Sequence, residues 1–125
     1  MNSYASVPGL LAAALVSGAV LADEAAASKA GEILVSQAGM TLYQFDKDMA
    51  GNGKSVCMET CAELWPPLQA AAGASVGGDY AVIVRDDGRR QWTYKGKPLY
   101  LYSKDKQAGE RNGDNFKEIW HVIKN

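Results

Sequence analysis

The chain has 125 residues, of which 47% are hydrophobic, with two cysteines, one histidine and a formal net charge of −1. This length fits one domain, and the well-mixed charges exclude the basic face that nucleic-acid binding requires. A single histidine leaves little acid–base machinery, and no Ser-His-Asp array is recognisable, so we expect no enzyme and no resident cofactor.

Residues 1–22 differ in composition from the rest of the sequence. Leu10–Ala22 is an unbroken run of small and apolar residues, too short for a bilayer span, which takes about 20 apolar residues. The run has the length of a signal-peptide core, and Val20 and Ala22 predict cleavage before Asp23. No Lys or Arg precedes it, so a buried N-terminal helix is the alternative.

After cleavage, residues 23–31 are expected to form a disordered, Ala-rich lead-in and residues 32–125 a single domain. We expect the mature protein to carry no transmembrane segment and to be periplasmic or secreted, where a disulfide is permissible. No cysteine ends the apolar run, which argues against a lipid anchor.

The first half predicts a hairpin followed by a short helix. In sequence order its elements are a strand at Ile33–Val35, a return strand at Met40–Phe45, a loop at residues 46–54 and a helix over about Cys57–Leu64. Strand alternation puts Tyr43 and Phe45 on one face. Ser55 is expected to cap the helix, and Pro66 and Pro67 to end it.

The second half predicts further antiparallel strands joined by polar turns. Its elements are a surface connection at Gln69–Asp79, a strand at Tyr80–Arg85, a hairpin turn at Asp86–Gly88, a partner strand at Arg89–Tyr94, a strand at Leu99–Tyr102 and a polar loop at Lys104–Asn115. In the last segment, Phe116, Ile119 and Trp120 stand at helical spacing, although a short terminal strand fits equally well.

One segment of the sequence recurs. Gly39–Asp48 and Gly96–Asp105 share Gly, Leu, Tyr, an aromatic residue, Lys and Asp at one constant offset. Each copy then runs through a Gly-containing loop to a tryptophan, Trp65 in the first and Trp120 in the second. Self-similarity of this kind indicates one structural unit used twice.

Together these elements predict an α+β, β-rich fold of antiparallel hairpins in two pseudo-repeated halves, with one or two short helices. The halves span about residues 33–68 and 80–123. An antiparallel sheet of this kind can bury one face beneath such helices.

The repeated residues resemble those of bacterial secreted repeat proteins, often labelled lipoproteins, with the motif Yx(F/W/Y)xxD. Further matching residues are Cys57–Ala62, Trp65–Leu68, Arg85–Gly88, Gln91–Tyr94, Gly96–Tyr100 and Trp120–His121. The resemblance covers nearly all of Ile33–Val122 and implies an exported repeat protein, but no activity, because the family is uncharacterised in function. The residues assigned to the family pattern are Tyr43, Phe45, Asp48, Trp65, Trp92, Tyr94, Tyr100, Tyr102, Asp105 and Trp120.

Cys57 and Cys61 are the only cysteines. In an exported protein we expect them to form a disulfide, which by loop-closure entropy destabilises the unfolded state by about 2 kcal/mol. This structural interpretation requires no activity. Thiol–disulfide exchange is an alternative, although the usual redox motif has two residues between its cysteines rather than three.

A copper or other thiophilic-metal site is the second alternative. Thiolates at i and i+4 share one face of a helix, Met58 lies beside them, and soft sulfur ligands suit Cu(I). His121, the only histidine, is the candidate third ligand. The cysteine pair also resembles copper-chaperone sites of respiratory-oxidase assembly, although Ala62 stands where that pattern has Pro. In the repeat alignment His121 takes the place of Pro66, which favours packing beside a tryptophan.

Asp46, Asp48 and Asn52 are spaced like the start of a calcium loop, but Ala50 stands where an oxygen ligand is needed. We therefore favour turn capping for Asp48 and its repeat equivalent Asp105, through hydrogen bonds to their own backbone. A residue present in both copies most often serves the repeated fold.

The aromatic residues of the motif could bind sugar rings or bases, but at strand alternation they are expected mainly in the core. Tyr43 and Tyr100 are expected to place their hydroxyls at the rim of that core. The sequence thus favours a non-enzymatic exported binding or structural module, stapled by Cys57–Cys61, with an unknown partner. A copper-binding protein and a small redox protein are the alternatives.

Overall fold

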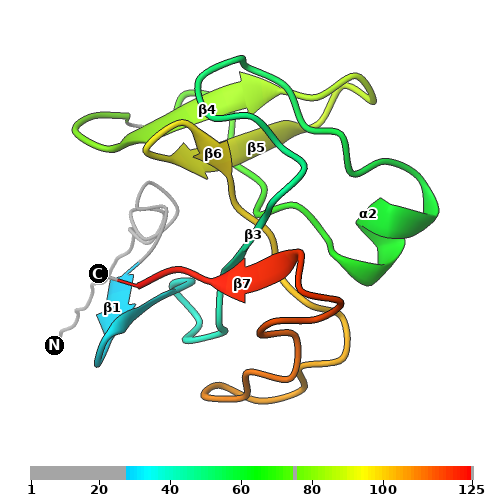
Figure 1. Ribbon diagram of the computed structural model, residues 1–125. Helices are drawn as coiled ribbons and strands as arrows, with labels where there is room; N and C mark the ends of the chain where they lie inside the picture. Colours follow the sequence, from blue (N-terminus) through cyan, green and yellow to red (C-terminus); the bar gives the residue numbers. More distant parts are fainter. Residues whose placement is uncertain (1–27, 75, 125) are drawn as a thin grey trace, which may run out of the picture.

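The computed structural model describes residues 28–74 and 76–124 (Figure 1). The predicted signal peptide and residues 23–27 lie outside the described residues. Within them the elements are β1 (Ser28–Ala30), β2 (Ile33–Val35), β3 (Tyr43–Phe45), α2 (Thr60–Leu64), β4 (Tyr80–Val84), β5 (Arg90–Tyr94), β6 (Lys97–Pro98) and β7 (Trp120–Val122). This strand-rich arrangement confirms the predicted β-rich α+β class.

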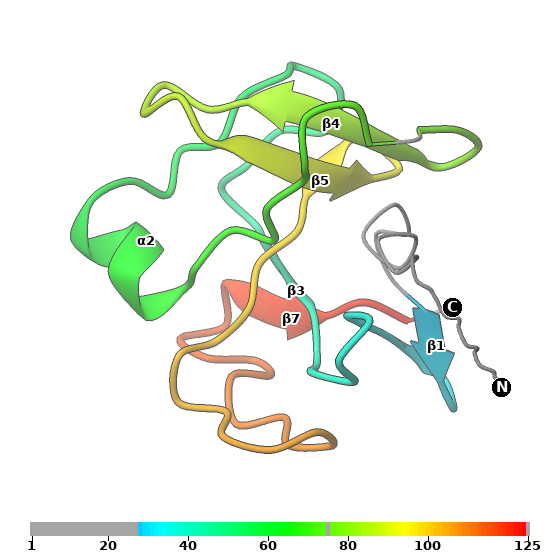
Figure 2. The same cartoon turned by 180° about the vertical axis from the view of Figure 1, so that it is seen from behind.

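The strands form three small antiparallel sheets. β1 pairs with β2, β3 pairs with β7, and β4, β5 and β6 form a three-stranded meander. The β3–β7 pair joins the two halves of the protein, with Tyr43 opposite Val122 and Phe45 opposite Trp120. Figures 1 and 2 show this pair between the meander at one end of the molecule and the long loop before β7 at the other.

The longest hairpin forms where the sequence predicts it. β4 and β5 pair along their whole length, and the turn between them contains Asp-Asp-Gly. Gly88 takes a φ of +88° there, and its N–H donates to the Arg85 carbonyl over 2.9 Å. A residue with a side chain would be strained at this φ, so the glycine is what allows the tight turn.

Strand β1 corrects the expectation of a disordered lead-in over residues 23–31. Ser28–Ala30 pairs antiparallel with β2. The three residues of β2 are buried, and Leu34 also donates its N–H to the Ile123 carbonyl over 2.9 Å. A buried strand with its hydrogen bonds satisfied supplies the partner that orders Ser28–Ala30.

The helix is shorter than predicted. α2 begins at Thr60 rather than Cys57, and Ser55 is not its cap. Glu59, which precedes the helix, has φ 56° and ψ −121°, and its side chain makes no capping hydrogen bond. This positive φ breaks the helical path. The helix ends at Leu64, before the Pro66 that disfavours helical geometry at the preceding residue.

The C-terminal segment is a strand, not a helix, despite the helical spacing of Phe116 and Trp120. Turns precede β7, and Asn115, Lys117 and Glu118 have φ values of 64°, 51° and 63°. A right-handed helix requires negative φ throughout. The strand alternative for this segment is therefore confirmed. Among the described residues, no helix has the length and apolar character needed to cross a bilayer.

The strand predicted at Leu99–Tyr102 is displaced along the sequence. β6 covers only Lys97–Pro98, and Tyr100 instead forms isolated bridges with Tyr43 and Pro67. The backbone leaves the meander here and crosses to the β3–β7 pair. Tyr100 thus belongs to the contact between the halves rather than to a hairpin of its own half.

Strand alternation separates two hydrophobic clusters. The first, named here the aromatic core, contains Tyr43, Phe45, Trp65, Tyr100, Tyr102 and Trp120, with Cys57, Ile33, Val35 and Val122 around them. The second contains Leu34, Leu42, Ala70, Trp92, Leu99 and Ile123. Tyr43 and Phe45 share a face, as predicted, while Leu42 and Tyr43 face opposite ways, and so do Leu99 and Tyr100.

Candidate functional site

The two copies of the motif meet antiparallel at their tyrosines. The Tyr43 N–H donates to the Tyr100 carbonyl over 2.8 Å, and the Tyr100 N–H donates back to the Tyr43 carbonyl over 2.9 Å. A reciprocal pair of this kind places equivalent residues of the two copies opposite each other. The motif thus marks a pseudo-two-fold axis between the halves.

Each tyrosine of the motif bonds to the aspartate of the other copy. The Tyr43 hydroxyl donates to Asp105 Oδ2 over 2.6 Å, and the Tyr100 hydroxyl donates to Asp48 Oδ2 over 2.6 Å. Both tyrosines are fully buried. The expectation that their hydroxyls lie at the rim of the core is wrong, because each reaches inward to the aspartate of the other copy. We call these contacts the crossed pairs.

The second carboxylate oxygen of each aspartate holds a loop. Asp48 Oδ1 accepts the Val56 N–H over 2.8 Å, and Asp105 Oδ1 accepts the Asn112 N–H over 2.9 Å. The aspartates therefore anchor the loop that follows each motif, instead of capping their own turn. Two donors to each buried carboxylate offset the cost of removing it from water.

Each buried phenol also receives one hydrogen bond. The Gly113 N–H donates to the Tyr43 hydroxyl over 3.2 Å. Tyr100 gives its proton to a carboxylate, so Ser55 is the donor in the 2.6 Å contact between their hydroxyls. The Ser55 hydroxyl in turn accepts the Cys57 N–H over 3.1 Å. The donor to the phenol oxygen is thus a serine hydroxyl from the first half for Tyr100 and a backbone N–H from the second half for Tyr43.

The tyrosines of the crossed pairs are held in their protonated forms. Burial raises the pKa of Tyr43 and of Tyr100 above 10.0, and the hydrogen bond to the partner aspartate raises each pKa further. Burial also raises the pKa of Asp48, by more than the hydrogen bonds from Tyr100 and Val56 lower it. At neutral pH the phenols are therefore hydrogen-bond donors of the fold rather than acids.

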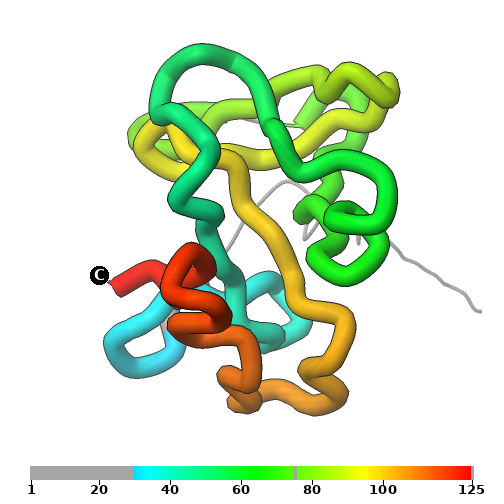
Figure 3. The backbone as a smooth tube through the Cα atoms, turned by 45° about the vertical axis from the view of Figure 1, so that its right-hand side comes forward, coloured from blue at the N-terminus to red at the C-terminus, as the bar shows by residue number. Residues whose placement is uncertain are grey.

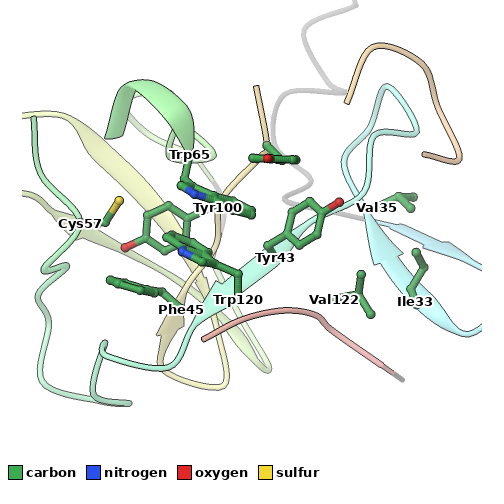
Figure 4. Close-up of a cluster of buried hydrophobic side chains, with 10 residues drawn as sticks. Ile33, Val35, Tyr43, Phe45, Cys57, Trp65, Tyr100, Trp120 and Val122 are labelled. Atoms are coloured by element: carbon green, nitrogen blue, oxygen red, sulfur yellow. The ribbon is translucent and has the colours of Figure 1, made fainter. Parts of the chain in front are cut away.

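The aromatic rings of the two copies are interleaved (Figure 4). Phe45 stacks on Trp120 with ring centroids 4.2 Å apart, Trp120 on Trp65 at 3.9 Å, and Trp65 on Tyr102 at 4.1 Å. The interplanar angles are 11°, 2° and 22°. The aromatic residue of each copy thus packs on the tryptophan of the other. The expectation of a core role is confirmed for these rings, whose faces are covered by one another.

The motif tyrosines complete this arrangement edge-on. Tyr43 meets Trp65 at 5.2 Å and 80°, and Tyr100 meets Trp120 at 5.1 Å and 89°. Edge-to-face contacts of this geometry add about 0.5–1.5 kcal/mol each beyond burial. Of the remaining family residues, Trp92 is buried and Tyr94 half-buried in the second cluster.

Cys57 and Cys61 form a disulfide. Cys57 is fully buried against the aromatic core, whereas Cys61 is half-buried in α2. The second half has no such bond, since these are the only cysteines. The disulfide therefore pins only the loop that follows the first copy of the motif.

A buried arginine fixes the same loop, and sequence reasoning did not assign it a role. Arg85 is only 2% exposed; its Nη2 donates to the Cys57 carbonyl over 2.6 Å, and its Nη1 donates to Ser55 at 3.0 Å and to Gln91 Oε1 at 2.7 Å. Its Nε donates to Asp87 Oδ2 over 3.2 Å. The usable signal was an arginine ending the apolar run of β4, where a charge must find partners.

A surface groove lies beside the disulfide. Its lining includes Met58, Glu59, Glu63, Pro66, Asp87 and Arg89. Arg89 donates to Asp87 Oδ2 over 2.9 Å, and its hydrogen bonds hold the pKa of Asp87 below the ordinary 3.8. We name the disulfide, Arg85 and this groove together the disulfide corner.

The candidate metal ligands are engaged in other contacts. Both cysteine sulfurs are in the disulfide, the Met58 sulfur lies 3.4 Å from Arg85 Nη2, and His121 Nε2 lies 2.9 Å from Asp46 Oδ2. In the part of the protein that the structure describes, no three His, Cys, Asp or Glu residues are grouped as a metal site would need. Asp48 is engaged by Tyr100 and Val56, which also removes it from the incomplete calcium loop.

Comparison with known proteins identifies the repeat. A family model described as a secreted repeat of unknown function matches residues 24–69 and again residues 81–124. Comparison with curated proteins and with solved structures finds no match. The two matches include both copies of the motif, and the secreted character of the family places the protein in the periplasm or outside the cell. The protein therefore belongs to the family of secreted repeats of unknown function.

Proposed function

We propose that this protein is a non-enzymatic, exported binding or structural module, held rigid by its crossed pairs and by the Cys57–Cys61 disulfide. The observation that carries the proposal is the exchange of motif side chains between the copies. The motif tyrosines and aspartates bond to one another, and among the described residues every buried nitrogen or oxygen of a side chain has a hydrogen-bond partner. The family motif is thus occupied in building the fold.

The disulfide corner is the proposed contact surface of this module. It is where the two halves differ most, since the loop after the first copy of the motif carries the disulfide and accepts hydrogen bonds from Arg85, and the groove lies between this loop and Asp87 and Arg89 of the second half. A ligand that met the repeated core would have to displace the stacked rings, whereas the groove is open to solvent. A rigid corner on a rigid core is the arrangement that favours binding without a loss of conformational entropy.

Mass spectrometry of the native protein, purified from the periplasm without reductant, tests this proposal. We expect a protein with Cys57 and Cys61 oxidised and with no bound metal. The copper alternative predicts near-stoichiometric Cu(I) uptake by the reduced protein, lost in Cys57→Ser and in Cys61→Ser. Such uptake would replace the proposal with a copper function.

Thiol reactivity separates the module from a redox protein. A redox role needs an exposed cysteine of low pKa, whereas Cys57 is fully buried and Cys61 half-buried. We expect slow alkylation of the reduced, folded protein by iodoacetamide and fast alkylation in urea, with Cys61 reacting before Cys57. Fast alkylation of the folded protein, accompanied by reduction of a disulfide substrate, would favour the redox alternative.

A further inference from the structure

The sequence has two Asn-Gly dipeptides, Asn52–Gly53 and Asn112–Gly113. In such a dipeptide the backbone nitrogen of the glycine can attack the amide carbon of the asparagine side chain. A new carbon–nitrogen bond closes a five-membered succinimide, the bond from that carbon to the amide nitrogen breaks, and ammonia leaves. Water then opens the ring to aspartate or isoaspartate. Glycine favours the reaction because it has no side chain to hinder the approach.

Asn52–Gly53 stands in the loop that follows β3, which forms the outer arc at the top of Figure 3. Both residues are exposed. Asn52 Oδ1 accepts the Lys54 N–H over 3.0 Å, which folds the side chain back over the Gly53 peptide and polarises the carbonyl that is attacked. Among the described residues the Gly53 N–H has no hydrogen-bond partner. Solvent thus reaches this site, and among the described residues no hydrogen bond restrains the Gly53 nitrogen.

Asn112–Gly113 is held by the crossed pairs instead. The Asn112 N–H donates to Asp105, and the buried Gly113 N–H donates to the Tyr43 hydroxyl over 3.2 Å. Gly113 also lies against Trp65, because a Cβ at this position would stand 2.5 Å from the ring. For Gly113 to attack its neighbour, its nitrogen must leave Tyr43 and the aromatic core must open locally.

A third dipeptide, Asp87–Gly88, shows the same protection by a different route. The Gly88 N–H donates to the Arg85 carbonyl over 2.9 Å. The Asp87 carboxylate is held by Arg89 at 2.9 Å and by Arg85 at 3.2 Å. Of the three dipeptides, only Asn52–Gly53 has an amide side chain beside a glycine nitrogen that lacks a partner in the described part of the protein.

We propose that Asn52–Gly53 is a site of spontaneous deamidation, and that the fold protects Asn112–Gly113 from the same reaction. Water is the only co-reactant, and no oxidant or reductant takes part. The product adds one negative charge to a protein whose formal net charge is −1. The isoaspartate form also lengthens the backbone of a loop that is tied to the turn before β6 through the Gly51 N–H and the Gly96 carbonyl, 3.0 Å apart. The modification therefore alters the surface next to Lys54.

Peptide mass spectrometry of the full-length protein tests this proposal, with the two sites as internal controls for each other. The native protein is aged in mildly alkaline buffer, and the conversion of Asn52 and of Asn112 to the acid forms is followed over time. We expect Asn52 to convert at least about tenfold faster, the factor for one lost hydrogen bond in the barrier. In urea, with the disulfide intact, the two rates should become similar. Equal rates in the native protein would overturn the proposal, and so would an unreactive Asn52 that reacts in urea.

Two variants assign the cause. Asn52→Gln keeps an amide but requires a larger ring, so conversion at residue 52 should nearly cease while Asn112 is unchanged. Tyr43→Phe removes the acceptor of the Gly113 N–H, so conversion of Asn112 should rise toward its rate in urea. If Asn112 in Tyr43→Phe stays as slow as in the wild type, the crossed pair is not what protects it, and that part of the proposal is wrong.

Discussion

The loop from Asp48 to Trp65 and the loop from Asp105 to Trp120 begin and end at equivalent residues but are built differently. The first contains a disulfide and a short helix, and the Arg85 guanidinium holds it through hydrogen bonds. The second has neither, and it follows turns with positive φ at three non-glycine residues before reaching its tryptophan. Both loops nevertheless deliver a tryptophan to the same stack.

This difference teaches which features the repeat requires. The crossed pairs and the ring stack are related by the pseudo-two-fold axis, so we infer that the fold requires them. The path between aspartate and tryptophan does not obey it, so that path is free to vary. Each copy depends on side chains of the other, and neither half can complete its own core. The contacts that follow the axis should therefore respond alike in the two halves, and the others should not.

The largest expected effect comes from the tryptophans at the centre of the stack. Trp65→Ala and Trp120→Ala should each lower the free energy of unfolding by about 3–5 kcal/mol, because a large buried ring is replaced by a cavity. The two losses should be similar, since the rings occupy equivalent positions. Urea unfolding monitored by circular dichroism measures both.

Val84→Ala is the matched control for this pair, because Val84 is 59% exposed and its change should stay within about 0.5 kcal/mol. If one tryptophan variant were as stable as this control, the stack would not be shared equally between the halves.

The crossed pairs should produce the next largest effect. Tyr100→Phe removes a donor from a buried carboxylate and should cost about 1.5–3 kcal/mol. In double-mutant cycles, Tyr100→Phe should couple strongly to Asp48→Asn, in the other copy of the motif, and be additive within about 0.5 kcal/mol with Asp105→Asn, in its own copy. Chemical denaturation of the single and double variants gives both couplings.

Coupling of Tyr100 to Asp105 and not to Asp48 would mean that each motif closes on itself in solution. The mirror-image cycle, with Tyr43→Phe against Asp105→Asn and Asp48→Asn, repeats the test in the other half and shares no substituted tyrosine with the first.

Loss of the disulfide should affect the loop after the first copy of the motif and leave the loop after the second copy unchanged. Reduction of Cys57–Cys61 should lower the free energy of unfolding by about 2 kcal/mol, the entropy of closing a short ring. Hydrogen exchange should speed up in the loop over residues 55–64 while the loop over residues 105–119 stays protected. The Cys57→Ala/Cys61→Ala double variant is the control, because its stability should no longer respond to reductant. Equal loosening of both loops would show that the disulfide supports the whole core.

The sequence predicts the repeated parts of this structure well and the exchanged parts poorly. The motif, the β4–β5 hairpin and the paired cysteines were readable because each depends on residues near one another in the sequence. The partner of each motif aspartate was not, because a repeat gives the two copies identical residues and does not say which copy bonds to which. Arg85 was missed for a related reason, since its partners Ser55 and Cys57 come from a loop far away in sequence.

The C-terminal segment shows a second limit of sequence reasoning. The apolar spacing of Phe116, Ile119 and Trp120 fits a helix, yet Lys117 and Glu118 adopt positive φ. Neither residue type signals that conformation. It is imposed by the need to bring Trp120 onto Trp65 and Phe45, a tertiary requirement that overrides local preference.

The smallest effect, and the one most specific to the crossed pairs, is expected in alkali. The folded-state pKa of Tyr43 and of Tyr100 is raised above the unfolded value of 10.0. As pH rises past that value, the unfolded state releases these protons while the folded state retains them, so the free energy of unfolding falls. The stabilisation is complete below the unfolded pKa and is lost progressively above it. Urea unfolding at about pH 9 and about pH 11 measures the loss, and tyrosinate absorbance shows whether the two phenols ionise only when the protein unfolds.

The Tyr43→Phe/Tyr100→Phe double variant is the control for this titration. It should be less stable than the wild type at about pH 9, but its stability should depend less on pH above that point, because the two shifted groups are gone. The two single variants should each remove a similar share of the slope, since the two tyrosines have equivalent surroundings. If only one of them did so, the Ser55 hydroxyl that donates to Tyr100 and the Gly113 N–H that donates to Tyr43 would not be equivalent donors. The two phenol oxygens would then differ in surroundings, although the rest of the two copies is related by the pseudo-two-fold axis. If the double variant kept the full slope, the phenols would be ionising in the folded protein, and the crossed pairs would not be the closed, water-free contacts that hold the two halves together.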